Sequence, residues 1–233
     1  MEIGENLWKK RKKQILSTPF NNIQDTPLVN IVYDTSLFFY FVDFVCDEPH
    51  DLLLLLDSSN SISDKTWSQI KTFAVQFAGR MNRKVVNIDF IVFGDRARFV
   101  DSSEVVSTSD ISKFARLAGP KRLDIAMLLA KKSFDAAVNA RTRKIIVIIT
   151  SDDSLDSLTT EDRETSMLKN MQSSGIEMYT MVVRKDTMLL DQETTTKFGK
   201  LTSKPIGKYM FSSKAYDISK WSTVLAMKTC RSD

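Results

Sequence analysis

The sequence is poor in the residues on which many catalytic centres depend. Its 233 residues include one histidine, His50, and two cysteines, Cys46 and Cys230. His50 precedes the first predicted strand, so a Ser-His-Asp or Cys-His centre has no suitable base. Neither a G-x-G-x-x-G segment nor a Walker-type loop occurs in the chain. The usual nucleotide-binding sites are therefore excluded.

Linkers, repeats and long apolar runs are missing as well. No Pro/Gly/Ser-rich stretch divides residues 50–230, and 42% hydrophobic residues are enough to build one core. The longest uncharged stretch near the N-terminus, residues 35–42, is short for a membrane span and lies between Asp34 and Asp43. The sequence therefore predicts one domain and no stable membrane span.

The chain has a small net charge. The net charge is +4, and along the whole sequence lysines and arginines are dispersed among acids. The one basic cluster, residues 9–13, lies outside the predicted domain. This pattern predicts no nucleic-acid partner.

The most informative stretch that is present is a run of five leucines, residues 52–56, which stops at an acid. Such a run is typical of a strand buried on both faces of a parallel sheet. Asp57, Ser59 and Ser61 follow at alternate positions, where open α/β sheets bind ligands. Their hard oxygen donors suit a cation of the Mg²⁺ type. An Asp/Ser-rich turn that only caps the next helix is the alternative interpretation.

Strands and helices alternate along the rest of the chain. Strands that alternate with helices of this length imply right-handed crossovers and a mostly parallel sheet. The predicted strands are 85–95, 96–100, 144–150, 176–183 and 209–211, and the predicted helices are 64–82, 123–139, 160–173 and 214–228.

The spacing D-x-S-x-S after a hydrophobic strand resembles the metal-ion-dependent adhesion site of von Willebrand factor type A domains. The second strand of that family commonly ends in an aromatic residue, a small residue and an acid, and residues 93–95 are similar. The resemblance covers about residues 50–230. It implies a Rossmann-like three-layer α/β sandwich, with a mostly parallel central sheet, one short antiparallel edge strand (96–100) and helices on both faces. It also implies that ligands approach the top face, defined here as residues 57–61, 119–124 and 151–156.

The predicted metal site departs from the family pattern in two loops. The family's second loop is approximately T-x-T-x-x-A-L, whereas Lys121 and Leu123 stand at the two threonine positions. The third loop is T-D-G, whereas Ser151 stands at the acid and Asp152 follows one residue late. A lysine ammonium about 4 Å from Asp57 would replace a cation, with an attraction on the order of 4 kcal/mol at an effective dielectric of about 20.

We therefore expect a weak or degenerate metal site, with Asp57, Ser59, Ser61 and Asp152 as candidate ligands. With Lys121 at the threonine position, no cofactor is expected. Mg²⁺ or Mn²⁺ could still bind, together with water, if Lys121 swung outward and Asp152 turned inward. The side chains predicted to face a ligand are Asp57, Ser59, Asn60, Ser61, Lys121, Arg122, Asp124 and Asp153.

The two cysteines lie on either side of the region that resembles the family. The termini of compact domains are often close together, and a bridge between them is familiar in extracellular type A domains. The resemblance therefore implies a disulfide between Cys46 and Cys230, which would persist only in an oxidising compartment. Two unpaired thiols in a cytosolic protein are the alternative.

Residues 1–45 form an N-terminal extension that differs in character from the predicted domain, residues 46–233. A basic start is followed by a segment rich in aromatic and aliphatic residues, an order typical of an export signal. We favour a degenerate export signal over an element that packs on the domain and over a disordered tail.

These features together predict a non-enzymatic, secreted module that binds an extracellular-matrix or cell-surface protein through the top face. An intracellular type A scaffold that assembles a complex is one alternative, and reduced cysteines would mark it. A hydrolase that uses Asp57 with a bound cation is the other alternative. Turnover that is abolished by Asp57→Ala would mark the hydrolase.

Overall fold

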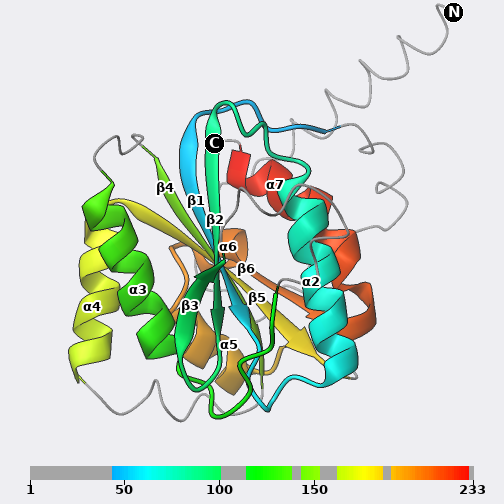
Figure 1. Cartoon of the computed structure of the whole chain (residues 1–233). Coiled ribbons are helices and arrows are strands. Elements are labelled where there is room, and N and C mark those ends of the chain that lie inside the picture. The colour runs from blue at the N-terminus through cyan, green and yellow to red at the C-terminus, as the bar shows by residue number, and fades with distance from the viewer. Residues whose placement is uncertain (1–43, 101–113, 138–142, 153–161, 186–189, 231–233) are drawn as a thin grey trace, which may run out of the picture. The chain divides into compact units, whose positions relative to one another are not determined.

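The strand that contains the leucine run, β1 (His50–Asp57), lies near the centre of a six-stranded sheet (Figure 1). The computed structural model describes residues 44–100, 114–137, 143–152, 162–185 and 190–230. The sheet has the order β3-β2-β1-β4-β5-β6, and only the β2–β3 pair is antiparallel among these strands. The predicted fold class is therefore confirmed, including its antiparallel edge strand. The other strands are β2 (Val86–Phe93), β3 (Ala97–Val100), β4 (Lys144–Ser151), β5 (Ile176–Arg184) and β6 (Met210–Lys214).

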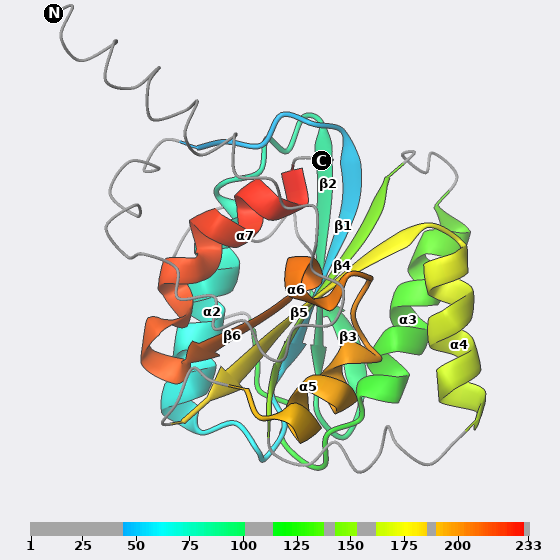
Figure 2. The same cartoon turned by 180° about the vertical axis from the view of Figure 1, so that it is seen from behind.

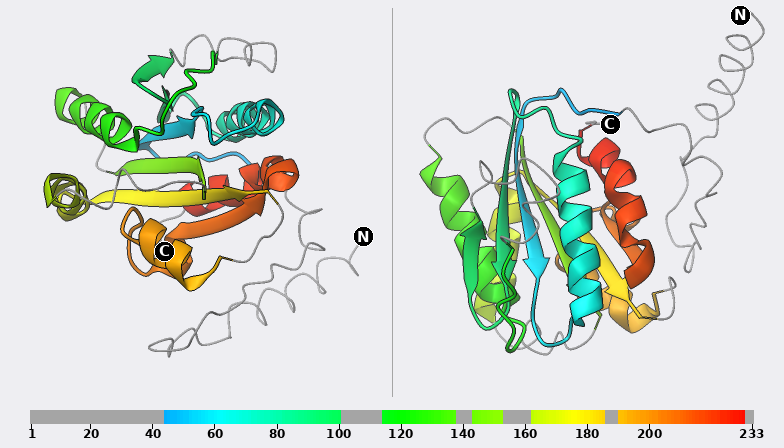
Figure 3. Two further views of the ribbon diagram at one scale, coloured as in Figure 1. Left: turned by 90° about the horizontal axis from the view of Figure 1, so that it is seen from below. Right: turned by 45° about the vertical axis from the view of Figure 1, so that its right-hand side comes forward.

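Helices cover both faces of the sheet, as Figures 1 and 2 and the oblique views of Figure 3 show. One face is covered by α2 (Asp64–Ala78), the 3₁₀ helix η5 (Ala215–Lys220) and α7 (Trp221–Cys230). The other face is covered by α3 (Leu123–Ala136), α4 (Asp162–Ser173) and α5 (Gln192–Gly199). A single-turn helix, α6 (Ile206–Tyr209), leads into β6.

The five leucines of β1 serve both layers of the core. Successive side chains of a strand point to opposite faces, so Leu52, Leu54 and Leu56 join the core under α2 and α7. Leu53 and Leu55 join the core under α3 and α4. Each of the five is at most 2% exposed. The run is uninterrupted because neither face of this strand contacts water.

The predicted helix 64–82 ends earlier than expected, at Ala78. The backbone of residues 80–82 instead pairs with the segment that leads into β1. The Cys46 amide donates to the Arg80 carbonyl at 2.7 Å, and the Asn82 amide donates to the Cys46 carbonyl at 2.9 Å. This pairing fixes Cys46 beside the sheet, which the helical periodicity of the sequence could not reveal.

The C-terminal elements also differ in detail from the prediction. The last strand is Met210–Lys214 rather than 209–211, and the predicted helix 214–228 consists of η5 followed by α7. Neither α5 nor α6 was predicted. The α5 sequence contains three threonines, which are poor helix formers, and it buries only Phe198 and Gly199. Its start is fixed by Asp191, whose carboxylate accepts a hydrogen bond from the Thr194 amide at 2.7 Å.

The division of the chain at residues 45 and 46 stays a prediction, because residues 1–43 are outside the described part of the chain. The uncharged stretch 35–42 is outside it too. Among the helices of the described residues, none combines the length and the apolar character that a membrane crossing requires.

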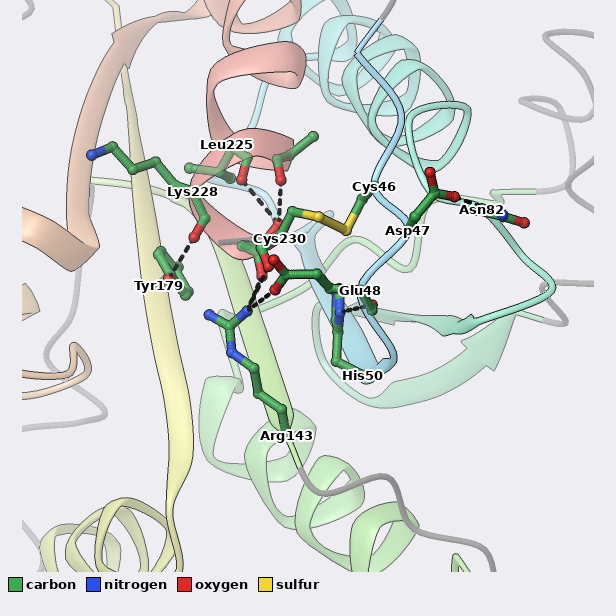
Figure 4. Close-up of a disulfide and its surroundings, with 12 residues drawn as sticks. Cys46, Asp47, Glu48, His50, Asn82, Arg143, Tyr179, Leu225, Lys228 and Cys230 are labelled. Atoms are coloured by element: carbon green, nitrogen blue, oxygen red, sulfur yellow. Dashed lines mark hydrogen bonds and ion pairs between the residues drawn. A yellow bond between two sulfur atoms is a disulfide. The ribbon is translucent and has the colours of Figure 1, made fainter. Parts of the chain in front are cut away.

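The expected disulfide is confirmed at the end of the sheet opposite the top face (Figure 4). Cys46 and Cys230 are bonded, with their Cα atoms 5.5 Å apart and 184 residues apart in sequence. Closing a loop of this length stabilises a fold by up to about 5 kcal/mol in the chain-entropy model. The bond ties the last residue of α7 to the segment that precedes β1.

Arg143 holds the same end of α7 by hydrogen bonds. Its Nη1 donates to the carbonyls of Thr229 and Cys230 at 2.7 and 3.1 Å, where the helix leaves carbonyl groups unpaired. Its Nε and Nη2 donate to the Glu177 carboxylate at 2.5 and 2.9 Å. Burial disfavours the charged form of both side chains, but the hydrogen bonds and the attraction between them have the larger combined effect. The pKa of Arg143 is therefore raised, and the pKa of Glu177 is lowered.

His50 is fully buried beside this cluster. Its Nδ1 lies 2.7 Å from the Glu48 carbonyl, to which it donates. Its Nε2 has no hydrogen-bond partner among the described residues. Burial lowers the pKa of the imidazole, and the charge of Arg143 lowers it further, while Glu48 and Glu177 oppose the shift. The folded protein therefore binds a proton at His50 less readily than the unfolded chain does.

We predict that the free energy of unfolding decreases as the pH falls from about 7.5 to 5.5. The unfolded chain takes up a proton near the ordinary histidine pKa of about 6.5, whereas the folded protein does so only at lower pH. Urea unfolding across this range measures the effect. His50→Asn keeps a donor near Nδ1 and does not titrate, so its stability should depend less on pH. Equal pH dependence in the two proteins would refute the assignment to His50.

Candidate functional site

Asp57 ends β1 at the top face and is completely buried. Its carboxylate accepts hydrogen bonds from β4, which pairs with β1 in the sheet, and from the loop that follows β1. The Thr150 hydroxyl donates to Oδ2 at 2.7 Å, and the Ser59 amide donates to Oδ1 at 2.9 Å. The Ser151 amide lies 3.4 Å from Oδ2. These donors fix the carboxylate between the ends of β1 and β4, which are neighbouring strands.

The Lys121 ammonium lies against this carboxylate. Its Nζ is 3.3 Å from Asp57 Oδ2, and the two side chains are 2% and 0% exposed. The ammonium also donates to the carbonyl and to the hydroxyl of Ser151, at 2.8 and 3.0 Å. At this separation the attraction is on the order of 5 kcal/mol at an effective dielectric of about 20. A buried charge requires such a partner, so each residue accounts for the burial of the other.

The three serines of the site form a chain of hydroxyl groups. Ser59 and Ser61 are linked at 2.7 Å between their Oγ atoms, and the Ser151 hydroxyl donates to Ser61 at 2.9 Å. Ser151 thus accepts from Lys121 and donates to Ser61. The structure therefore brings Asp57, Ser59 and Ser61 of the D-x-S-x-S stretch together with Lys121 and Ser151 of the next two loops, and it adds Thr150.

The residues present do not fit a divalent cation. The space between Asp57 and Ser151 is bridged by the Lys121 ammonium, whose charge repels a metal. Mg²⁺ also requires oxygen ligands at about 2.1 Å, usually including carboxylates, and Asp57 is the only carboxylate in the hydrogen-bond network described above. Among the described residues, no three carboxylate, histidine or cysteine side chains gather as a metal-binding group.

Asp152, the remaining candidate ligand, is engaged on β5. Its Oδ2 lies 2.6 Å from Arg184 Nε, in an ion pair rather than an aligned hydrogen bond. Arg184 Nη2 also lies 3.7 Å from Asp191. An inward turn of Asp152 toward Asp57 would break the pair with Arg184. Its assignment as a metal ligand stays a prediction.

The other predicted ligand-facing residues lie around this centre. Arg122 holds the Asp124 carboxylate by two hydrogen bonds, at 2.9 and 2.6 Å, which lowers the pKa of Asp124. The Asn60 amide donates to the Gly119 carbonyl at 2.9 Å, and the Gly119 amide donates to the Asn60 side-chain oxygen at 3.1 Å. Asp153 lies outside the described residues.

Arg116 is a residue of the site that the sequence did not reveal. Its guanidinium donates to the carbonyls of Ser58, Ser59 and Ile62 and to the Asp64 carboxylate. It thereby holds the loop after β1 in place from the loop before α3. Because its partners are mostly carbonyl groups, no motif in the sequence could have identified it.

A close approach of backbones joins the top-face loops. A Cβ on Gly94 would collide with the Ala118 carbonyl, and Gly119 has a φ of +72°, which glycine adopts readily. The Asp95 amide donates to the Ala118 carbonyl at 2.9 Å, and the Ala118 amide donates to the Ser58 carbonyl at 3.1 Å. Three loops are therefore hydrogen-bonded to one another through their backbones.

Comparisons with known proteins agree with this architecture. The family model of the von Willebrand factor type A domain matches residues 51–223. Solved structures of proximal thread matrix protein 1 from the mussel byssus share the fold, at 12% identity and TM-scores of 0.63, 0.63 and 0.62. The third of these is described as having a zinc-occupied MIDAS motif.

The matches cover 80% of this chain but only 48% or 49% of the mussel protein, so the chain spans about half the length of that protein. At 12% identity, the likeness shows the fold alone. A comparison with curated protein sequences found no match.

We predict that Lys121→Met destabilises the fold by about 3–5 kcal/mol, because it leaves the Asp57 carboxylate buried without its cation. Adding Asp57→Asn should restore part of the loss, since both charges are then absent. Urea unfolding of the single and double variants measures the coupling.

Lys131→Met is the matched control for this prediction. It breaks a surface pair with Asp135, at 2.5 Å with side chains 38% and 61% exposed, which contributes less than about 1 kcal/mol. A Lys121→Met variant as stable as this control would contradict the prediction.

Proposed function

Because the chain belongs to the von Willebrand factor type A family, we propose that it is a non-enzymatic extracellular module. In this proposal it binds a matrix or cell-surface protein through the top face, without a metal ion. Domains of this family mediate protein–protein interactions, and the mussel neighbour is a matrix protein. The buried Lys121–Asp57 pair carries the metal-free part of the proposal.

The ammonium replaces the charge of a cation but not its coordination chemistry. In metal-using members a carboxylate of the partner completes the coordination sphere. Here three oxygens lie within 3.3 Å of Lys121 Nζ, matching the three donors of an ammonium. A carboxylate of the partner would have to displace one of them. The partner therefore contacts the exposed rim of the top face, where Asn60 and Arg122 are accessible.

The loops of the top face support recognition of this kind. Hydrogen bonds between their backbones, together with Arg116, hold them in one arrangement. Binding by a preformed surface avoids the entropy cost of ordering loops on contact. A face whose loops are joined by direct hydrogen bonds is suited to metal-independent binding.

The disulfide supports an extracellular location, because such a bond persists in oxidising compartments. It also argues against the intracellular scaffold, which would have reduced cysteines. The site itself gives no support for a hydrolase. His50, the only histidine, is at the opposite end of β1 from Asp57 and cannot act as its base.

We predict that the protein binds Mg²⁺, Mn²⁺ and Ca²⁺ weakly or not at all in calorimetric titrations. Lys121→Thr combined with Ser151→Asp should create binding, because the change removes a positive charge and adds a carboxylate. The double variant should also unfold at a higher temperature with Mg²⁺ than without it. A micromolar dissociation constant for the parent protein would show that the ammonium does not exclude the metal.

We also predict that capture on immobilised extracellular-matrix proteins is unaffected by EDTA and is weakened by Arg122→Ala. Arg122 is exposed on the top face, so its loss should affect the partner more than the fold. Arg83→Ala removes an exposed arginine just before β2, at the opposite end of the sheet, and serves as the matched control. Capture that EDTA abolishes, or that both variants weaken equally, would refute the proposed binding face.

A further inference from the structure

The Asp57–Lys121 pair places an amine beside a carboxylate in the interior of the protein. Lys121 Nζ lies 3.3 Å from Asp57 Oδ2, and the two side chains are 2% and 0% exposed. The pair between Lys131 and Asp135 is closer, at 2.5 Å, but its side chains are 38% and 61% exposed. The buried pair therefore holds the two reactants of an amide bond where bulk solvent scarcely reaches them.

Burial of this pair favours its conversion to an amide. Removing an ammonium and a carboxylate from water is unfavourable, and their attraction offsets this cost only when the geometry is good. Condensation replaces the two charges by one neutral amide and releases one water molecule to the solvent. For free ions in water the reaction is opposed by their hydration, whereas here the fold has already removed that hydration.

The surrounding hydrogen bonds hold both reactants in place. Reactants fixed beside each other behave as if they were present at about 10⁵–10⁸ M. The carboxylate accepts from the Thr150 hydroxyl at Oδ2, at 2.7 Å, and from the Ser59 amide at Oδ1, at 2.9 Å. The ammonium donates to the carbonyl and the hydroxyl of Ser151, at 2.8 and 3.0 Å. Neither group can turn away without breaking these bonds.

We propose that Lys121 and Asp57 condense after folding into an isopeptide bond between β1 and the loop before α3. One proton moves from Nζ to Oδ2, and the free amine attacks the Asp57 Cγ. The C–N bond forms while Oδ1 takes the negative charge, which the Ser59 amide stabilises. A second proton moves from the nitrogen to Oδ2, the C–Oδ2 bond breaks, and water leaves. The third proton stays on the amide nitrogen, so no other reactant is required.

Two hydroxyl groups assist this reaction. The Thr150 hydroxyl donates to the oxygen that leaves, and a proton donor at a leaving oxygen accelerates such a step. The Ser151 hydroxyl accepts from Lys121 and donates to Ser61 at 2.9 Å. Ser61 is half-buried, so these hydroxyls connect the pair with solvent. The released water therefore has a polar route out of the site.

Intact mass spectrometry of the reduced full chain tests the proposal. The mature protein should be lighter than its sequence by one water molecule. Trypsin should then yield a branched peptide that joins residues 14–65 to residues 117–122, because a modified Lys121 is not cleaved. Lys131 is the internal control, since its exposed pair should stay unbonded and trypsin should cleave after it. A chain with its full mass and normal cleavage after Lys121 would overturn the proposal.

Variants distinguish the reaction from a purely structural role of the pair. Asp57→Asn should lose ammonia instead of water and reach the same mass as the mature parent, because both give the same amide. Lys121→Met should keep its full mass, and a loss of water in this variant would also overturn the proposal. If the parent keeps its full mass, it retains the ion pair, and the proposed metal-free binding face is unaffected.

The rate of the mass loss after cell-free synthesis tests the role of the hydroxyl. Thr150→Val removes the donor to Oδ2 at nearly constant volume and should slow the reaction roughly a hundredfold. Ser213→Ala is the matched control, since it removes a buried hydroxyl from β6 that donates to the Lys214 carbonyl. It should leave the rate unchanged. Equal rates in the two variants would refute the role of Thr150.

Discussion

A buried ion pair between Asp57 and Lys121 organises the carboxyl end of the sheet. It joins the end of β1 to the loop before α3, and Ser151 joins β4 to the same ammonium. Three segments far apart in sequence thus share one charge centre. Burying either charge alone would cost several kcal/mol, so the surrounding loops are held where both charges are satisfied. In metal-using members of the family a cation has this role, and here a covalently attached ammonium takes it.

This exchange has consequences for recognition. A bound metal can leave and can accept a ligand from a partner, whereas a lysine does neither. The loops of the top face are joined by backbone hydrogen bonds and by Arg116. In the proposed function, binding specificity comes from the shape and polarity of the rim. The opposite end of the molecule is fixed just as firmly, by the disulfide and by Arg143 on the last carbonyls of α7.

On the top face, positive groups are paired at short range, as Arg122 is with Asp124 and Arg184 with Asp152. Paired charges of this kind favour short-range contacts over long-range attraction.

The sequence by itself determined the architecture and the outline of the site. The leucine run and the alternation of strands and helices predicted the sheet, because burial on both faces requires continuous apolar residues. The D-x-S-x-S spacing located the loop, and the lysine at position 121 predicted an ammonium beside Asp57. These signals are local, so they survive in a one-dimensional pattern.

Only the tertiary structure decided which oxygens the lysine contacts, how Arg116 ties the loops together, and that Arg184 holds Asp152. Each of these depends on residues that are distant in sequence and adjacent in space, and no periodicity records such distances.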